Sequence, residues 1–319
     1  MNLESITNLL GDNWKGYSSL IREQLHSDVS LLNDINESQL AHPGKQVRPI
    51  LSLLFAQACG TPGPDSYRVA AAVEMLHNAT LMHDDVADAS DTRRGLPTLH
   101  SLVGPTPAIL IGDFWLARAI STLSGNTSFI GIFADTASNL AEGEMLQLQC
   151  AASASTSQED YLRIIYCKTA SLFETSCRAG ALSAGASPQI CQAAADFGRA
   201  FGLAFQIRDD ILDYTGDEGF GKPVGIDLRE QKITLPLLGL LSKCDDAEEV
   251  REMVRQIPAH PEYCDKLYQR VRDEGGVEYA LGYLDEYTAA ALDALEALPD
   301  GPERKMLVEI VQFGIARRV

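Results

Sequence analysis

The sequence lacks several features that would place it in the membrane or in an oxidising compartment. No uninterrupted apolar run in its 319 residues approaches the roughly 20 that a membrane-spanning helix needs. Its seven cysteines are scattered, odd in number and without a C-x-x-C pair, which favours reduced thiols over disulfides or a zinc site. The N-terminus has no basic segment followed by an apolar block, so no signal peptide is expected. We therefore expect a cytoplasmic protein without stable membrane insertion.

Positive charge is scarce. The chain has 26 Lys and Arg against 44 Asp and Glu, which gives a net charge of −18. Binding to nucleic acid depends on clustered basic side chains that displace counterions, so no nucleic-acid partner is expected. Anionic small substrates remain possible, because they require only local positive charge.

Signals for β-strands are also missing. We find no alternating β-branched runs and no N-G or D-G turn between such runs. Fourteen prolines instead divide the chain into segments that are rich in Ala, Leu, Glu and Gln, with apolar residues at three- and four-residue spacing. The prediction is an all-α fold, with one domain over residues 1–319 packed as a single large helix bundle around a central cavity. Helices are predicted at about 5–34, 47–59, 65–91, 107–122, 127–153, 158–186, 188–215, 229–242, 246–256, 263–297 and 303–317.

The stretch LMHDDVADASDTRRG, residues 81–95, places four aspartates at the end of an apolar helix. Asp84 and Asp88 are four residues apart and share a face, and His77 lies on nearly the same stripe. Like charges at that spacing repel each other unless a cation lies between them. One such cluster is typical of a solvated helix end, and Asp91 is expected to be only a cap or a solvated charge.

The same spacing returns at FQIRDDILDYTGD, where Asp209, Asp210 and Asp213 follow Gln206. Two D-D-x-x-D motifs, each at the end of a long apolar helix, indicate carboxylates that face each other. Oxygen ligands of this kind suit Mg²⁺, which usually keeps waters and substrate phosphates in its shell. Basic residues near turns and helix ends would bind the phosphates; these are Lys45, Arg48, Arg93, Arg94, Lys168, Lys222 and Lys232. The prediction is a site for diphosphates bridged by Mg²⁺.

From about residue 40 onward, the sequence resembles the trans-isoprenyl diphosphate synthases, or polyprenyl synthetases, of the long-chain type. The motifs that carry the resemblance are, in order, GKQVRP, EMLHNATLMHDDVADASDTRRG, ILIGDF, AEGEMLQL, CKTASLF, AFQIRDDILDYTGD and GKPVGIDLREQKITLPL. The resemblance implies the isoprenoid synthase fold, Mg²⁺ as cofactor and a homodimer.

The resemblance also implies roles for individual residues. Metal ligands would be Asp84, Asp88 and Asp209, with Asp85, Asp210 and Asp213 close by and Glu144 and Gln147 supporting metal-bound water. An allylic diphosphate would be held by Arg93, Lys168, Thr169, Gln206, Lys222 and Lys232, with Lys168 also counted among the catalytic residues. Isopentenyl diphosphate would bind without metal, through Lys45, Arg48, His77 and Arg94.

The implied reaction is chain elongation. Mg²⁺ and cationic side chains stabilise the departing diphosphate, and the isopentenyl double bond attacks the resulting allylic cation. Loss of a proton, for which the released diphosphate is the preferred acceptor, gives a chain that is one isoprene unit longer. A dry apolar cavity would keep water from the cation.

Small side chains just before the first motif predict a long product. Ala79 and Thr80 stand five and four residues before Asp84, where enzymes with short products tend to have aromatic residues, and Leu76 lies one turn deeper. We therefore expect a product longer than farnesyl diphosphate. A geranylgeranyl product stays open, because Phe129 or Phe133 could form the floor of the channel.

Four positions depart from the family pattern: Pro43, Gln46, Arg208 and Gln231. Two other functions occur on the same fold. A terpene cyclase would normally replace the second D-D-x-x-D with Asn, Ser or Thr and Glu, and it would not need GKQVRP. A non-catalytic regulatory subunit would typically lack some of the aspartates, whereas all are present here.

Overall fold

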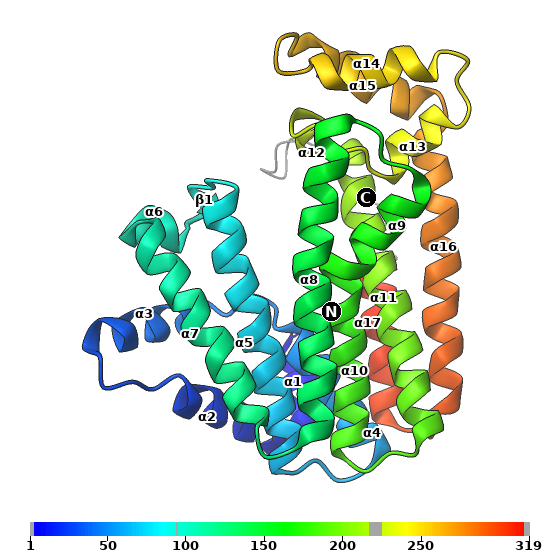
Figure 1. The fold of residues 1–319 in the computed structure, drawn as a ribbon. Helices are drawn as coiled ribbons and strands as arrows, with labels where there is room; N and C mark the ends of the chain where they lie inside the picture. Colours follow the sequence, from blue (N-terminus) through cyan, green and yellow to red (C-terminus); the bar gives the residue numbers. More distant parts are fainter. Residues whose placement is uncertain (1–2, 94, 217–224, 316–319) are drawn as a thin grey trace.

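Long upright helices dominate the computed structural model, which describes residues 3–93, 95–216 and 225–315 (Figure 1). Its only strands in these ranges are two-residue segments, so the all-α prediction is confirmed. Among the helices of these ranges, none combines the length and the apolar character needed to cross a bilayer.

The centre of the bundle consists of four helices that pack closely against one another. They are α4 (Val47–Cys59), α5 (Pro64–Ala87), α10 (Ser171–Ser183) and α11 (Pro188–Thr215). Eight consecutive residues of α4, 49–56, are buried, as expected for a helix that is covered on all sides. Glycine permits the closest approach, because a Cβ on Gly180 of α10 would lie 2.2 Å from the carbonyl oxygen of Ser52 in α4. The two backbones are therefore in direct contact.

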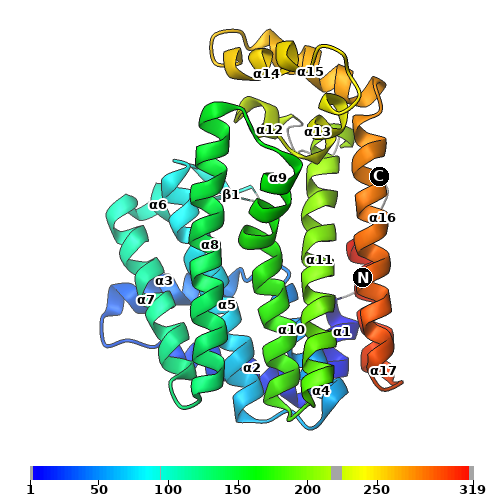
Figure 2. The same ribbon diagram turned by 45° about the vertical axis from the view of Figure 1, so that its right-hand side comes forward.

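Other helices surround this centre (Figure 2). Helix α7 (Pro105–Leu123) packs against α5, and α16 (Gly276–Ala294) packs against α11 and α13 (Leu235–Leu241). Helix α8 (Thr127–Ser153) runs beside α10, and α17 (Pro302–Gly314) contacts α4. Helices α14 (Ala247–Gln256) and α15 (Glu262–Asp273) form a hairpin across one end of the bundle.

Local signals fix where several helices begin. Proline occupies the first turn of α5, α7, α11 and α17, where its missing N–H costs no hydrogen bond. The Ser187 side chain accepts a hydrogen bond from the backbone N–H of Ile190 at the start of α11. Three predicted helices, at 47–59, 127–153 and 188–215, have the observed bounds.

Four predicted helices, at 5–34, 158–186, 229–242 and 263–297, are divided, so their prediction as continuous segments is wrong. Residues 5–34 fall in α1 (Leu3–Leu10), α2 (Asp12–Gln24) and α3 (Ser30–Ala41), with Gly11 at φ 52° between the first two. Residues 229–242 fall mainly in α13, after the short α12 (Ile226–Arg229). The window 263–297 breaks at Gly275, which has φ 81°. Each glycine adopts a left-handed conformation that a helix interior does not allow.

The end of α5 and the segment before α10 also differ from the prediction. Helix α5 ends at Ala87, and a hairpin of β1 (Thr92–Arg93) and β2 (Leu96–Pro97) leads to the short α6 (Leu99–Val103). The window 158–186 divides into α9 (Gln158–Ile165), a π-helical turn, η1 (Tyr166–Ala170), and α10.

Candidate functional site

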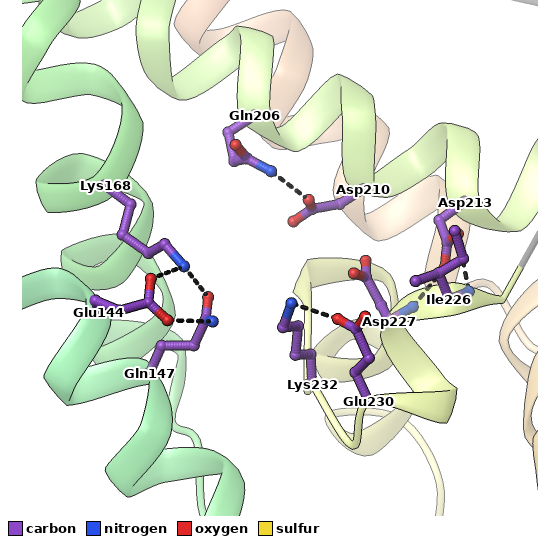
Figure 3. Close-up of polar contacts among 10 residues, drawn as sticks. All are labelled: Glu144, Gln147, Lys168, Gln206, Asp210, Asp213, Ile226, Asp227, Glu230 and Lys232. Atoms are coloured by element: carbon purple, nitrogen blue, oxygen red, sulfur yellow. Dashed lines mark hydrogen bonds and ion pairs between the residues drawn. The ribbon is translucent and has the colours of Figure 1, made fainter. Parts of the chain in front are cut away.

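A cavity of about 180 Å³ lies between α8, α9 with η1, α11 and the α12–α13 segment. Its lining brings together many residues that the sequence predicted as site residues, and Figure 3 shows most of them facing one another. The predicted residues in the lining are Gln147, Lys168, Thr169, Gln206, Asp210 and Lys232.

Lys168 enters the cavity from η1. The ammonium pairs with the Glu144 carboxylate and donates a hydrogen bond to Gln147 Oε1 at 2.9 Å. A Cβ on Gly143 of α8 would lie 2.6 Å from the Cβ of Cys167, so this glycine lets α8 approach η1 closely. π-Helical turns of this kind often occur at functional sites, because they re-aim side chains within a helix.

Asp210 is the centre of a buried hydrogen-bond network. Its carboxylate accepts hydrogen bonds from Gln206 Nε2 at 2.9 Å and from the Tyr161 hydroxyl at 2.7 Å. The Thr169 hydroxyl donates to Gln206 Oε1 at 2.8 Å. Burial, with the added charge of Asp209, raises the pKa of Asp210 to about 7. Asp209 itself is exposed.

Asp213 anchors α12. Its two carboxylate oxygens accept hydrogen bonds from the backbone N–H groups of Ile226 and Asp227, each at 3.1 Å (Figure 3). This third aspartate of the second motif therefore holds the chain segment that leads to Lys232.

Asp84, the first aspartate of the first motif, lies among charged side chains of both signs. Burial and the charge of Glu144 raise its pKa to about 6, with a smaller contribution from Asp88. The charges of Lys168 and Arg93 oppose this increase. Asp84 is therefore near enough to Glu144 of α8 and Lys168 of η1 for their charges to act on it.

The other two aspartates of the first motif have different partners. Asp85 is buried, and its Oδ1 pairs with Arg93 Nε at 2.7 Å. Asp88 is the exposed C-cap of α5. Burial lowers the pKa of Lys232, but the carboxylates of Glu230, Asp227 and Asp88 together raise it above its ordinary value. Asp88 and Lys232 are thus near enough across the site to interact.

A second group of predicted residues, Lys45, Arg48 and His77, lies outside the lining of this cavity. Arg48 Nη1 and His77 Nε2 are 3.1 Å apart, and the Arg48 guanidinium lies 4.3 Å from the centre of the Phe173 ring. Lys45 is exposed. Gln46, one of the departures, has φ 48° and donates from Nε2 to the Tyr17 hydroxyl at 2.8 Å.

The predicted chain-length residues lie on α5. Leu76 and Ala79 are buried, whereas Thr80 is partly exposed and donates its hydroxyl to the carbonyl oxygen of His77 at 2.8 Å. Phe129 and Phe133 are buried on α8, which packs against α5.

Two predicted residues are not described by the structure, and some residues of the cavity lining were not predicted. Arg94 and Lys222 lie outside the described residues. Tyr161, Asp227 and Thr156 line the cavity but were not predicted. Asp227 could have been found, because it is an acid within GKPVGIDLREQK, between two predicted phosphate-binding lysines.

A divalent cation fits this set of donors. Burial raises the pKa values of Asp84, Asp210 and Asp227, and the negative charges of neighbouring carboxylates add to this rise. Within the described ranges, no three His, Cys, Asp or Glu side chains converge on one ion position. Mg²⁺ tolerates this, because it commonly uses one or two carboxylates and takes its other ligands from water and phosphate.

The stability of the metal-free protein should therefore depend on pH. Because the folded state raises the pKa of Asp84 to about 6, the favourable protonated form is lost as pH rises from about 4 through 6. Bound Mg²⁺ would offset the resulting repulsion. Excess MgCl₂ should raise Tm by about 4 °C near pH 8 and by about 1 °C or less near pH 5. Thermal unfolding in MgCl₂ and in NaCl of equal ionic strength measures this shift in Tm. Equal Tm shifts at pH 8 and pH 5 would contradict the prediction.

Known proteins are similar to this chain over most of its length. The profile of the polyprenyl synthetase family matches residues 29–271. Octaprenyl diphosphate synthase of Escherichia coli (strain K12) is 36% identical over 322 residues, which cover 99% of each chain. The crystal structure of a decaprenyl diphosphate synthase from Rhodobacter capsulatus has a TM-score of 0.91 at 34% identity, over 99% of each chain. A polyprenyl synthase from Caulobacter crescentus CB15, complexed with calcium and isoprenyl diphosphate, has a TM-score of 0.89 at 34% identity, over 100% of this chain and 98% of that one. The chain therefore belongs to the polyprenyl synthetase family, and it is a chain-elongating prenyltransferase.

Proposed function

We propose that the enzyme condenses isopentenyl diphosphate with an allylic diphosphate and makes an all-trans polyprenyl diphosphate longer than farnesyl. The observation that carries the product length is the small, buried Ala79 on α5, five residues before Asp84. A side chain of this size would leave room for the growing chain below the proposed metal ligands. The relatives named octaprenyl and decaprenyl diphosphate synthase support this length.

Mg²⁺ is the proposed cofactor, held by Asp84 and Asp88 from α5 and by Asp209 from α11. When bound, it would neutralise the negative charge of the departing diphosphate. The raised pKa of Asp84 supports this role, because buried carboxylates with insufficient positive charge around them favour a cation. Asp85 and Asp210 then hold Arg93 and Gln206, through the hydrogen bonds described above.

The side chains of the protein have complementary tasks. Lys168 and Lys232, with Thr169 and Gln206, would bind the allylic diphosphate from opposite sides of the cavity. Arg48 and His77 would bind isopentenyl diphosphate without metal, together with Lys45. Arg93, Arg94 and Lys222 are proposed as further diphosphate ligands, from the sequence.

A geranylgeranyl product is the second candidate. It is favoured by Phe129 and Phe133, whose buried rings on α8 could close the channel early. Incubation with labelled isopentenyl diphosphate, Mg²⁺ and each allylic primer, followed by product sizing, distinguishes the two lengths. Failure to elongate any primer would refute the proposed function.

Ala79→Tyr should shorten the products by several isoprene units while primer turnover continues, because the larger ring would fill the channel below Asp84. The same sizing assay measures this change. Ala79→Ser is the matched control and should leave the product unchanged, since it keeps a small side chain. An unchanged product with tyrosine would mean that Ala79 is only a helix-packing contact.

Three further properties remain predictions: a homodimer, a cytoplasmic location and one domain over residues 1–319. Sedimentation of the purified protein would test the homodimer.

A further inference from the structure

Helix α14 touches two opposite walls of the cavity. On one side, Arg251 Nη1 donates to the carbonyl oxygens of Ala154 at 2.9 Å and of Thr156 at 3.5 Å, in the turn between α8 and α9. Thr156 lines the cavity. On the other side, Gln231 Nε2 donates to the carbonyl oxygens of Val254 at 3.0 Å and of Arg255 at 3.1 Å, in the last turn of α14. Figure 1 shows α14 lying across this end of the bundle, beyond the ends of α8 and α12.

Gln231 has a backbone conformation that is unusual for a residue other than glycine. Its φ of 57° lies in the left-handed region, where glycine would be without strain. The side chain compensates for this, because it donates to two carbonyl oxygens in the last turn of α14, of which that of Val254 also accepts from the backbone N–H of Ile257. The backbone N–H of Gln231 also donates to the carbonyl oxygen of Leu228 at 2.9 Å, and that of Lys232 donates to the carbonyl oxygen of Asp227 at 2.8 Å. Gln231 thus joins a compact turn to α14, immediately before Lys232.

We propose that α14 is a brace across the mouth of the cavity, and that Gln231 and Arg251 are positioning residues for the allylic diphosphate. Gln231 fixes the turn that carries Lys232, and Arg251 fixes the α8–α9 turn on the opposite wall. The brace sets the distance between Lys232 and Lys168, whose ammonium groups approach the substrate from opposite sides. The identity of the ligand rests on the proposed function, whereas the brace itself rests on the hydrogen bonds.

Steady-state kinetics of Gln231→Gly, Arg251→Met and the double variant test the substrate effect. Each single change should raise KM for the allylic diphosphate about fivefold or more, since small displacements of binding groups weaken binding, while kcat stays within about twofold. In the double variant, KM for the allylic diphosphate should rise by less than the product of the two single-variant factors, because both residues act through α14. Arg255→Gln is the matched control, since Arg255 pairs only with exposed acids of α14, Glu248 and Glu252, among the ion pairs of the described chain. It should leave both KM values unchanged.

Gln231→Gly should fold normally, because glycine adopts this φ without strain, so its Tm should stay within about 2 °C. A fall in Tm with equal loss for both substrates would indicate a general structural role and overturn the proposal. An unchanged KM for the allylic diphosphate in both single variants would also overturn it.

Hydrogen exchange of the substrate-free protein separates the brace from the proposed function. Amides in 226–234 should exchange faster in Gln231→Gly and in Arg251→Met than in wild type, and Arg255→Gln should match wild type. Unchanged exchange would overturn the brace, whether or not the protein elongates any primer. If exchange rises but Lys232→Gln leaves the allylic KM unchanged in an active enzyme, the substrate role of the brace is wrong.

Discussion

Asp84→Ala should lower kcat/KM for elongation by about 1,000-fold or more, which corresponds to about 4 kcal/mol of lost transition-state stabilisation. Glu144, Asp88, Lys168 and Arg93 all act on the charge of Asp84. Its removal would take away a metal ligand and leave the opposing cations without a central anion. Turnover of labelled isopentenyl diphosphate with a saturating primer measures the loss.

The stability of this variant provides an independent check. Burial raises the pKa of Asp84 to about 6, so the ionised carboxylate is unfavourable in the metal-free protein. Removing it should leave the Tm of that protein near pH 8 unchanged or higher. Asp91→Ala is the matched control, because the Asp91 side chain is 87% exposed and lies beyond the end of α5. A loss below about tenfold for Asp84→Ala, or equal losses for both variants, would contradict the metal-ligand role.

Lys168→Met should lower kcat by about 100-fold to 1,000-fold, the range typical of a preorganised charge that stabilises a transition state. The Lys168 ammonium lies in the cavity beside Glu144 and Gln147, and it opposes the increase in the pKa of Asp84. Without it, the pKa of Asp84 should rise further. As the solution is acidified, the elongation rate of Lys168→Met should therefore begin to fall at a higher pH than that of wild type.

Arg163→Met is the control for this experiment. Arg163 is five residues earlier, and its exposed side chain lies 3.9 Å from Glu142. The substitution removes a positive charge of the same size from the neighbouring surface, and it should leave kcat within about twofold. If Lys168→Met retained most of the activity, or if its pH profile did not move, Lys168 would not act on the departing diphosphate.

The sequence predicted the helical class and many residues that meet at the cavity, because both depend on local spacing. Proline positions and apolar periodicity gave the bounds of α4, α8 and α11. The two D-D-x-x-D motifs predicted carboxylates at facing helix ends. Their separate tasks were not predictable, since consecutive residues of a helix point about 100° apart. The rotation of α11 against α10 and α16 decides that Asp210 is buried and that Asp209 is exposed.

The departures from the family pattern illustrate what spacing alone leaves out. Gln46 and Gln231 both adopt left-handed backbone conformations, and each side chain bonds to a distant element. Arg208 donates to the carbonyl oxygen of Gly314 at 2.8 Å, at the end of α17. These partners are 29, 23 and 106 residues away, so their contacts exist only in the folded chain.

The π-helical turn at 166–170 has a consequence for insertions and deletions in this part of the chain. Such a turn accommodates one more residue than an α-helical turn, so the buried stripes of α9 and α10 are offset by one residue in sequence while both still face the core. Deleting one residue from the turn would let it close as ordinary α-helix. Tyr161 and Ile164 would then keep facing the core, whereas Lys168 and Thr169 would lose their present directions. A deletion here should therefore reduce activity more than stability, whereas a one-residue deletion within α9 or α10 should rotate one buried stripe by roughly 100°.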